Sequence, residues 1–274
     1  MLVVVGVPFG WAIYLSLTNA TGGSLSGKFV GFDNFVHVWG DGNFQTALKN
    51  TLIITFASQA LVLAGASILS HYIVREFRGR WILRFLVILP WAAPVVMSTI
   101  GWLWLLDSAF SVLNWTLAQF HLMNAQNPRQ WLGHPTEAKL AITVVHAWRI
   151  LPFAVVIFIA GLASIPNEVE DAAKIDGATG IRKLWYVTLP LQLPIALVAL
   201  LFGIVFTAGD FAVVQILTAG GPFNSTQVLT TWSFATGINS GALGEGAAIC
   251  LYLFPLLAVV TVVMLFFARR AQVA

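Results

Sequence analysis

Two ionisable side chains, Arg149 and Asp210, lie inside long apolar stretches of this sequence. A charged group in such surroundings is costly unless it is paired or wetted, so these residues mark candidate functional positions. Two explanations of them are equally strong. They form a structural ion pair or cap a backbone group, or they line a polar pathway through the apolar region, to which Gln215 would also contribute.

No catalytic pattern accompanies these side chains. The sequence lacks the G-x-x-x-x-G-K-[ST] phosphate loop and the H-E-x-x-H zinc motif, and its five histidines are scattered. The stretch 134–137 has no usable metal spacing, and Cys250, the single cysteine, cannot form a disulfide within the chain. We therefore predict no catalytic site, no metal site and no cofactor in this chain.

Six charged residues gather in one internal segment, EDAAKIDGATGIRKLWYVTLP, residues 170–190. Pro166 suits the first turn of a helix because its missing N–H has no partner there. Three acids then fall near the positive end of the helix dipole: Glu168, Glu170 and Asp171. Asp176-Gly177 predicts the end of this helix, since glycine tolerates the left-handed conformation. A second short helix is expected to follow, capped by Thr179.

Ala172 and Ala173 give the first of these helices an almost bare face, which another surface can approach closely. The acidic first turn could pair with basic groups across that contact. An amphipathic helix lying on the bilayer is the alternative. It is less favoured because anionic membrane surfaces attract basic helices, and this helix begins with acids.

The elements that must position these residues are membrane spans. Of the 274 residues, 58% are hydrophobic and 9% are charged, against about 25% charged residues in soluble domains. With about 20 apolar residues for each span, the sequence predicts an all-α polytopic membrane protein, a single domain over 1–274. About six spans are expected, at 2–17, 51–74, 82–106, 138–163, 189–219 and 246–268.

A cleaved signal peptide is the competing interpretation of residues 2–17. No Lys or Arg precedes this apolar run, which favours a span.

Basic residues in the loops predict the orientation, because Lys and Arg accumulate on the cytoplasmic side. Nine of them fall on one side of a six-span arrangement: Arg75, Arg78, Arg80, Arg84, Lys174, Arg182, Lys183, Arg269 and Arg270. Four fall on the other: Lys28, Lys49, Arg129 and Lys139. Both termini and the loop 164–189 are therefore predicted to be cytoplasmic.

The segment 171–190 resembles the cytoplasmic signature loop of permease subunits in binding-protein-dependent ABC importers. The family pattern is Glu-Ala-Ala, then Asp-Gly-Ala three residues on, then a hydrophobe before Thr-Leu-Pro. Asp171 stands where the family usually has Glu, and Leu184 and Val187 replace the usual Phe and Ile. The matching positions are Ala172, Ala173, Asp176, Gly177, Ala178, Leu189 and Pro190.

Other stretches resemble the carbohydrate-uptake branch of that family. They are FVGFDNF (29–35), AWRILPFAVVIFIAGLASIP (147–166) and ILTAGGP (216–222). The resemblance implies a permease in a bacterial or archaeal cytoplasmic membrane, surrounded by lipid and without a nucleic-acid partner. A sugar or oligosaccharide is the first expectation for its solute, and a glycerol-phosphate-type ester is the second.

The resemblance also implies partners and a mechanism. A second homologous permease completes the pathway, an extracytoplasmic binding protein delivers the solute, and a separate ATPase dimer binds ATP and Mg²⁺. The ATPase would dock on Glu170, Asp171, Ala172, Ala173, Asp176 and Gly177. Its closure would then drive alternating access. An ion-coupled secondary carrier and an integral-membrane enzyme stay as alternatives.

Overall fold

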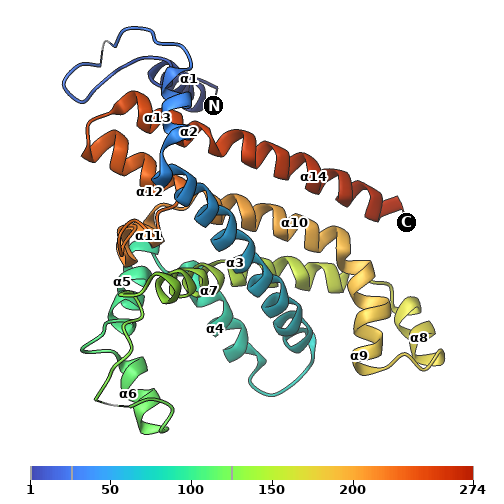
Figure 1. Ribbon diagram of the computed structural model, residues 1–274. Coiled ribbons are helices and arrows are strands. Elements are labelled where there is room, and N and C mark those ends of the chain that lie inside the picture. The colour runs from blue at the N-terminus through green and yellow to red at the C-terminus, as the bar shows by residue number, and fades with distance from the viewer. Residues whose placement is uncertain (1, 26, 125, 274) are drawn as a thin grey trace. The chain divides into compact units, whose positions relative to one another are not determined.

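The computed structural model describes residues 2–25, 27–124 and 126–273, and its regular elements are helices (Figure 1). The side chains of Leu2, Glu170, Ile181 and residues 271–273 lie outside this description. The α-helices are α1 (Leu2–Ser16), α2 (Asp33–Gly40), α3 (Gly42–Val74), α4 (Arg80–Ala92), α5 (Val95–Leu105), α6 (Val112–Gln119), α7 (Pro135–Ala163), α8 (Asn167–Ile175), α9 (Gly180–Lys183), α10 (Leu189–Ala208), α11 (Ala212–Leu217), α12 (Leu229–Phe234), α13 (Leu243–Leu251) and α14 (Leu253–Val273). Two π-helical turns are η1 (Leu184–Thr188) and η2 (Ala235–Asn239). The predicted all-α class is confirmed.

Four helical segments are long and apolar enough to cross a membrane: Gly42–Val74, Pro135–Ala163, Leu184–Ala208 and Leu243–Arg270. Gly42–Val74 begins nine residues before the predicted span 51–74, and the other three begin three to five residues before theirs. The apolar helix Val3–Ser16 is shorter than a full span. The number of six spans therefore stays a prediction.

The predicted span 82–106 is broken in two. Helices α4 and α5 meet at an angle of 103°. Pro94 follows Ala93, whose backbone is extended at φ −73° and ψ 137°. A residue before proline avoids the α conformation because the proline ring would clash with it. The sequence therefore ends α4 at this point, and the two pieces have the length and apolar character of either a broken span or a re-entrant loop.

The predicted span 189–219 is also interrupted. Helix α10 ends at Ala208, and α11 begins at Ala212 after a short non-helical segment. Asp210 lies in that segment, two residues beyond the end of the candidate span Leu184–Ala208, so the predicted span 189–219 extends too far. Its carboxylate caps the start of α11, which is described below.

The chain forms two compact units. The first comprises Met1–Thr55, Val95–Val145 and Ala208–Ala258, and the second comprises Phe56–Pro94, His146–Thr207 and Val259–Ala274. A buried core of the first unit is built around Ile142, Val145, Val213 and Leu217. That of the second is built around Val62, Ile150 and Phe158, with small residues such as Ala66 and Ala154. Each unit thus has its own apolar core, while the single domain over 1–274 stays a prediction.

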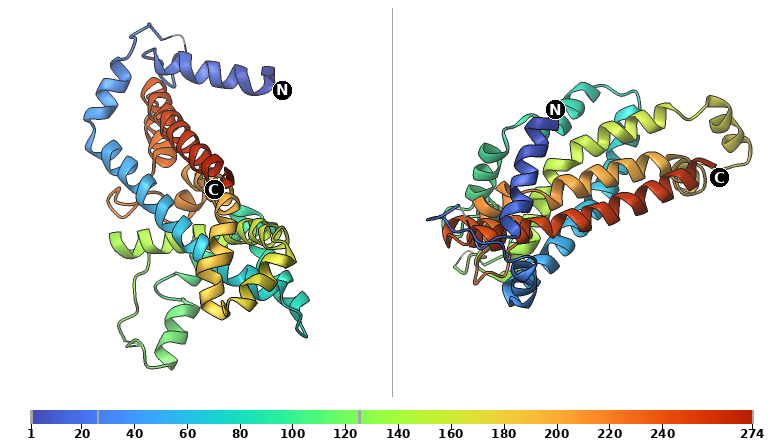
Figure 2. Two further views of the ribbon diagram at one scale, coloured as in Figure 1. Left: turned by 90° about the vertical axis from the view of Figure 1, so that its right-hand side faces the viewer. Right: turned by 90° about the horizontal axis from the view of Figure 1, so that it is seen from above.

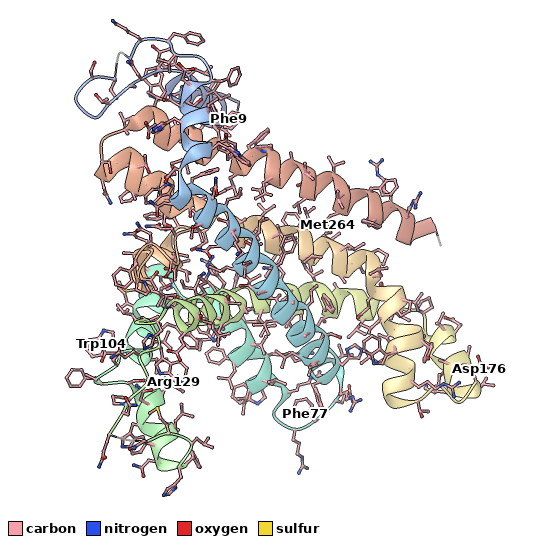
Figure 3. All side chains as sticks on the ribbon, viewed as in Figure 1. Phe9, Phe77, Trp104, Arg129, Asp176 and Met264 are labelled. Carbon is pink, nitrogen blue, oxygen red and sulfur yellow. The ribbon has the colours of Figure 1, made fainter. Side chains whose placement is uncertain are left out.

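Within the second unit, helices α8 and α9 lie beyond the end of α7 (Figures 1 and 2). Asp176 lies at the outer end of the loop between them (Figure 3). The second unit therefore carries a short charged helix away from its apolar core.

Candidate functional site

Helix α8 is largely exposed, and among its described side chains Ala173 is buried. Pro166, at φ −61° and ψ 143°, immediately precedes it. The two alanines of the predicted bare face differ, because Ala173 is 6% exposed whereas Ala172 is exposed. Ala173 therefore lies on the packed side of α8, and Ala172 belongs to the surface that a partner could approach.

The corner after α8 follows the predicted rule. The N–H of Ala178 donates to Ala173 O at 2.8 Å, and that of Gly177 donates to Lys174 O at 3.1 Å. This pair of bonds is the Schellman arrangement. In it, the residue that directly follows the C-cap of the helix adopts the left-handed conformation. Gly177 supplies it with φ +71°. The predicted glycine stop is confirmed, and it fixes the direction in which α8 points.

The acids of α8 have different surroundings. Asp171 accepts a 2.8 Å hydrogen bond from Lys174 Nζ, three residues on. That hydrogen bond and the charge of Lys174 hold the pKa of Asp171 below its usual value, with a smaller contribution from Lys183. Glu168 and Asp176 are exposed, and the side chain of Glu170 lies outside the described part. A basic partner must therefore compete with Lys174 for Asp171.

Asp210 has a structural role that can be stated bond by bond. Its Oδ1 accepts from the backbone N–H of Val213 at 2.8 Å, in the first turn of α11. Its carbonyl oxygen accepts from Thr230 Oγ1 at 2.8 Å. Aspartate in this position satisfies an N–H that has no partner within the helix. The carboxylate is half-buried, so this capping bond does not exclude it from a polar pathway.

Arg149 is half-buried in α7 and belongs to the second compact unit, whereas Asp210 belongs to the first. Their pairing stays a prediction. Gln215 is half-buried on α11, one turn after the cap. The pathway roles of these three residues are likewise predictions.

Sequence reasoning missed a polar stripe on α3. Asn50 is 1% exposed, and its Nδ2 donates to Ser225 O at 2.7 Å and to Gln227 O at 2.9 Å. Thr51 Oγ1 accepts from Leu229 N at 2.9 Å. These bonds tie the first half of α3 to the loop that precedes α12.

The stripe continues into the second unit. Gln59, also 1% exposed, donates from Nε2 to Thr207 Oγ1 on α10 at 2.9 Å. Gly203 lies directly against the Gln59 amide, where a Cβ would overlap its oxygen. Polar residues three and four apart on an apolar helix share one face. The spacing of Thr51, Thr55, Ser58 and Gln59 was the signal that could have found them.

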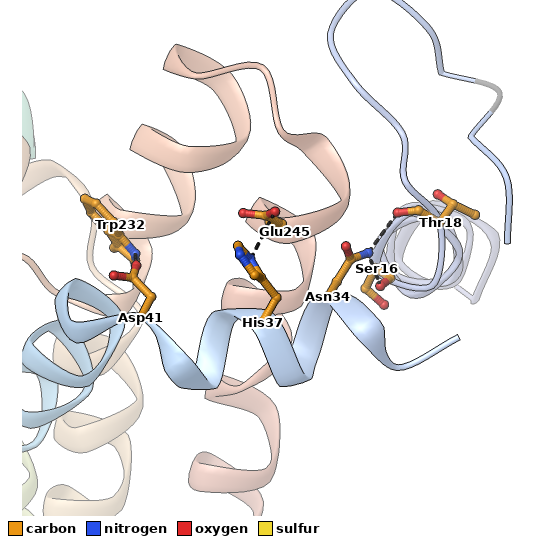
Figure 4. Close-up of polar contacts among 7 residues, drawn as sticks. All are labelled: Ser16, Thr18, Asn34, His37, Asp41, Trp232 and Glu245. Carbon is orange, nitrogen blue, oxygen red and sulfur yellow. Dashed lines mark hydrogen bonds and ion pairs between the residues drawn. The ribbon is translucent and has the colours of Figure 1, made fainter. Parts of the chain in front are cut away.

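A second missed network surrounds α2, within FVGFDNF and beyond it (Figure 4). Asn34 donates from Nδ2 to Ser16 O and to Thr18 O, both at 2.8 Å. Trp232 Nε1 donates to Asp41 Oδ2 at 3.0 Å, and His37 Nδ1 lies 3.2 Å from Glu245 Oε1. Helix α2 is therefore bonded to the end of α1 and to the segment 232–245.

Among the described residues, no group of three or more His, Cys, Asp and Glu side chains could hold a metal ion. The polar groups identified above serve instead as caps, interhelical bonds and an exposed charged helix. Such an arrangement positions helices and offers a docking element.

Comparisons with known proteins agree on one family. Residues 60–273 match the family described as "Binding-protein-dependent transport system inner membrane component". The chain is 29% identical over 265 residues to the trehalose/maltose transport system permease protein MalF of Thermococcus litoralis, covering 97% of this chain and 88% of that one. It is 30% identical over 244 residues to the sn-glycerol-3-phosphate transport system permease protein UgpA of Rhizobium meliloti, covering 88% and 81%.

Solved structures show the same fold. A bacterial ABC transporter involved in the import of the acidic polysaccharide alginate superposes with a TM-score of 0.82 at 20% identity, over 98% of this chain and 91% of that one. Its complex with a periplasmic protein bound to an alginate pentasaccharide gives a TM-score of 0.83. The apolar helices, the exposed charged helix and these matches agree. The chain belongs to the binding-protein-dependent transport system inner membrane components, as a permease subunit of an ABC importer.

Proposed function

We propose that this permease forms, with a second homologous permease, the pathway for a sugar, an oligosaccharide or a related polyhydroxylated solute. A separate ATPase dimer docks on α8 and supplies the energy. An extracytoplasmic binding protein delivers the solute. Both termini and the 164–189 loop lie on the cytoplasmic side, where the nine basic residues are grouped.

The observation that carries this proposal is the geometry of α8. The helix is exposed along most of its length, packed at Ala173, and fixed in direction by the Gly177 corner. A short helix with these properties transmits a push from a docked partner, because its exit cannot bend without breaking two backbone bonds. Movement of α8 would reach α10 through the short segment Gly180–Thr188.

The solute class is supported by the relatives. One is a permease for trehalose and maltose, another is a permease for sn-glycerol 3-phosphate, and a third serves sulfoquinovosyl glycerol in Agrobacterium fabrum. These solutes share hydroxyl-rich carbon skeletons. Neutral saccharides are the first choice. A glycerol-phosphate-type ester is the second, and it would need a compensating cation such as Arg149 in the pathway.

The test reconstitutes this chain with its second permease, ATPase and binding protein in proteoliposomes. Gly177→Val forces a β-branched residue into the left-handed region, at a cost of about 1–3 kcal/mol. Gly79→Val is the matched control, because Gly79 also has positive φ, +89°, and a Cβ there would meet only Ile82 Cδ1, at 4.0 Å. We expect Gly177→Val alone to lose ATPase co-purification and uptake while inserting normally.

Equal uptake by the two glycine variants would contradict docking on α8. Uptake that continues after ATP depletion would instead support an ion-coupled carrier. The solute class is tested separately, by identifying with mass spectrometry the molecule that co-purifies with the binding protein. A molecule without sugar or polyol character would contradict that part of the proposal.

A further inference from the structure

Two adjoining cavities lie where the end of α3 meets the segment that leads from the α8 loop into α10. Their volumes are about 360 and 340 Å³. His71, Arg75, Gly180 and Leu184 line both of them. The cavities therefore form one continuous recess within the second unit, outside the exposed face of α8.

The recess carries positive charge. Arg75 lines both cavities and Lys183 lines the second. Among the described residues that line them, none is a carboxylate. Lys183 does interact with Asp171, but that carboxylate is already held by Lys174 at 2.8 Å. Two cations at one recess, without an acid in its wall, favour an anionic ligand.

The wall of the recess is fixed in place. His71 Nδ1 lies 2.7 Å from Ser67 O, and because a carbonyl only accepts, this nitrogen carries the hydrogen. The Arg75 guanidinium lies 5.6 Å from the centre of the Tyr72 ring, an arrangement that holds the side chain by a cation–π interaction. The opposite wall contains the π-helical turn η1, an irregularity that is frequent at functional sites.

The rim is apolar and aromatic. Ile68, 59% exposed, and Tyr72, 56% exposed, line the first cavity on the α3 side. On the η1 side the lining residue Leu184 is followed in sequence by Trp185 and Tyr186, which are 64% and 77% exposed. Exposed aliphatic residues on a membrane-spanning helix contact lipid tails, and Trp and Tyr concentrate at the level of the headgroups. Apolar and aromatic side chains beside two cations are the composition expected where lipid tails meet headgroups.

We propose that this recess binds an anionic phospholipid. Its phosphate would be held between Arg75 and Lys183, and its acyl chains would lie along Ile68 and Tyr72. Arginine suits this role because its planar guanidinium can donate two hydrogen bonds to one phosphate. Basic pockets between spans bind lipid headgroups of this kind. A bound headgroup would bridge α3 and the Gly180–Thr188 segment, and so bias the movement of the α8 loop independently of the solute carried.

The test uses the complete transporter, extracted from its membrane and incorporated into nanodiscs of phosphatidylethanolamine and phosphatidylglycerol in equal amounts. Native mass spectrometry measures the ratio of the two lipids that stay bound. The double variant Arg75→Gln, Lys183→Gln removes both cations and keeps polar, somewhat shorter side chains. We expect it to lower the phosphatidylglycerol preference about thirtyfold, because each basic residue near a lipid surface contributes roughly a factor of five.

Three controls make the result decisive. Arg269→Gln with Arg270→Gln removes the same charge elsewhere and should retain the preference. Arg75→Lys with Lys183→Arg keeps the charge and should retain most of it, which separates binding from folding damage. Inorganic phosphate should not displace the lipid, because it lacks acyl chains.

A parent transporter that shows no phosphatidylglycerol preference would overturn the proposal, as expected if a protein subunit covers the recess. An equal loss of the phosphatidylglycerol preference in the Arg75→Gln, Lys183→Gln variant and in the Arg269→Gln, Arg270→Gln variant would overturn it too. The effect would then be a nonspecific effect of charge. Displacement by inorganic phosphate would show a free-anion site in place of a lipid site.

Discussion

At the residue scale, Asp210 combines a cap with a charge, and the two can be separated. Asparagine caps a helix as well as aspartate does, whereas alanine leaves the Val213 N–H without its acceptor. Asp210→Ala should therefore destabilise the first unit by about 1 kcal/mol, and Asp210→Asn should not. If the charge also serves the pathway, Asp210→Asn lowers solute uptake at unchanged thermal stability. Normal uptake by the Asn variant would leave the cap as the sole role.

The predicted pairing of Asp210 with Arg149 belongs to the same scale and has its own test. Thermal stability is measured for Asp210→Asn, Arg149→Gln and the double variant. A structural pair predicts that each single change is destabilising and that the double change recovers much of the loss, because no lone charge remains. Additive effects in this cycle would exclude the pair.

Gly203 and Gln59 give the sharpest packing prediction. Gly203→Ala places a methyl group on the Gln59 amide, and overpacking of this kind costs about 1–3 kcal/mol. Gln59→Ala removes the obstacle, so adding Gly203→Ala to it should cost clearly less. Gly101→Ala is the control, because a Cβ there meets nothing within 4 Å. Thermal unfolding of the four variants measures the coupling, and a coupling near zero would contradict the close approach of α3 and α10.

At the element scale, the loop before α12 is held in place by Asn50. One buried amide serves the carbonyls of both Ser225 and Gln227. Asn50→Ala leaves those carbonyls without a donor, at a cost of about 1–3 kcal/mol. Hydrogen exchange of residues 219–228 should accelerate in this variant, while that of α8 stays unchanged. Acceleration spread evenly over the chain would mean a general loss of stability in place of a local clamp.

The same scale shows which features could be read from the sequence. The Gly177 corner was predicted because its rule is local, involving one left-handed residue and the bonds next to it. The break at Asp210 was not, since apolar residues resume directly after it, at 211–214, and conceal the end of the helix. Pro94 could have indicated the bend between α4 and α5. The partners of Asn50 lie about 175 residues away in the sequence, so no local pattern names them.

At the scale of the whole molecule, the orientation rests on nine basic residues against four, and surface labelling tests it directly. Cysteines are introduced singly at exposed positions of a Cys250→Ala background: Glu76→Cys between α3 and α4, Asn127→Cys in the loop before α7, and Ser240→Cys before α13. None of these changes alters the count of Lys and Arg.

A membrane-impermeant maleimide applied to intact spheroplasts should modify the cysteines at 127 and 240 but not the one at 76. After lysis, the cysteine at 76 should also be modified. The loops at 127 and 240 must share one side because two crossings separate them, through α7 and through the Leu184–Ala208 segment. Labelling of position 76 alone in intact cells would show that the orientation is the opposite of the predicted one. It would also place α8 outside the cytoplasm, where no ATPase can reach it. Labelling of 127 without 240 would instead contradict the number of crossings between them.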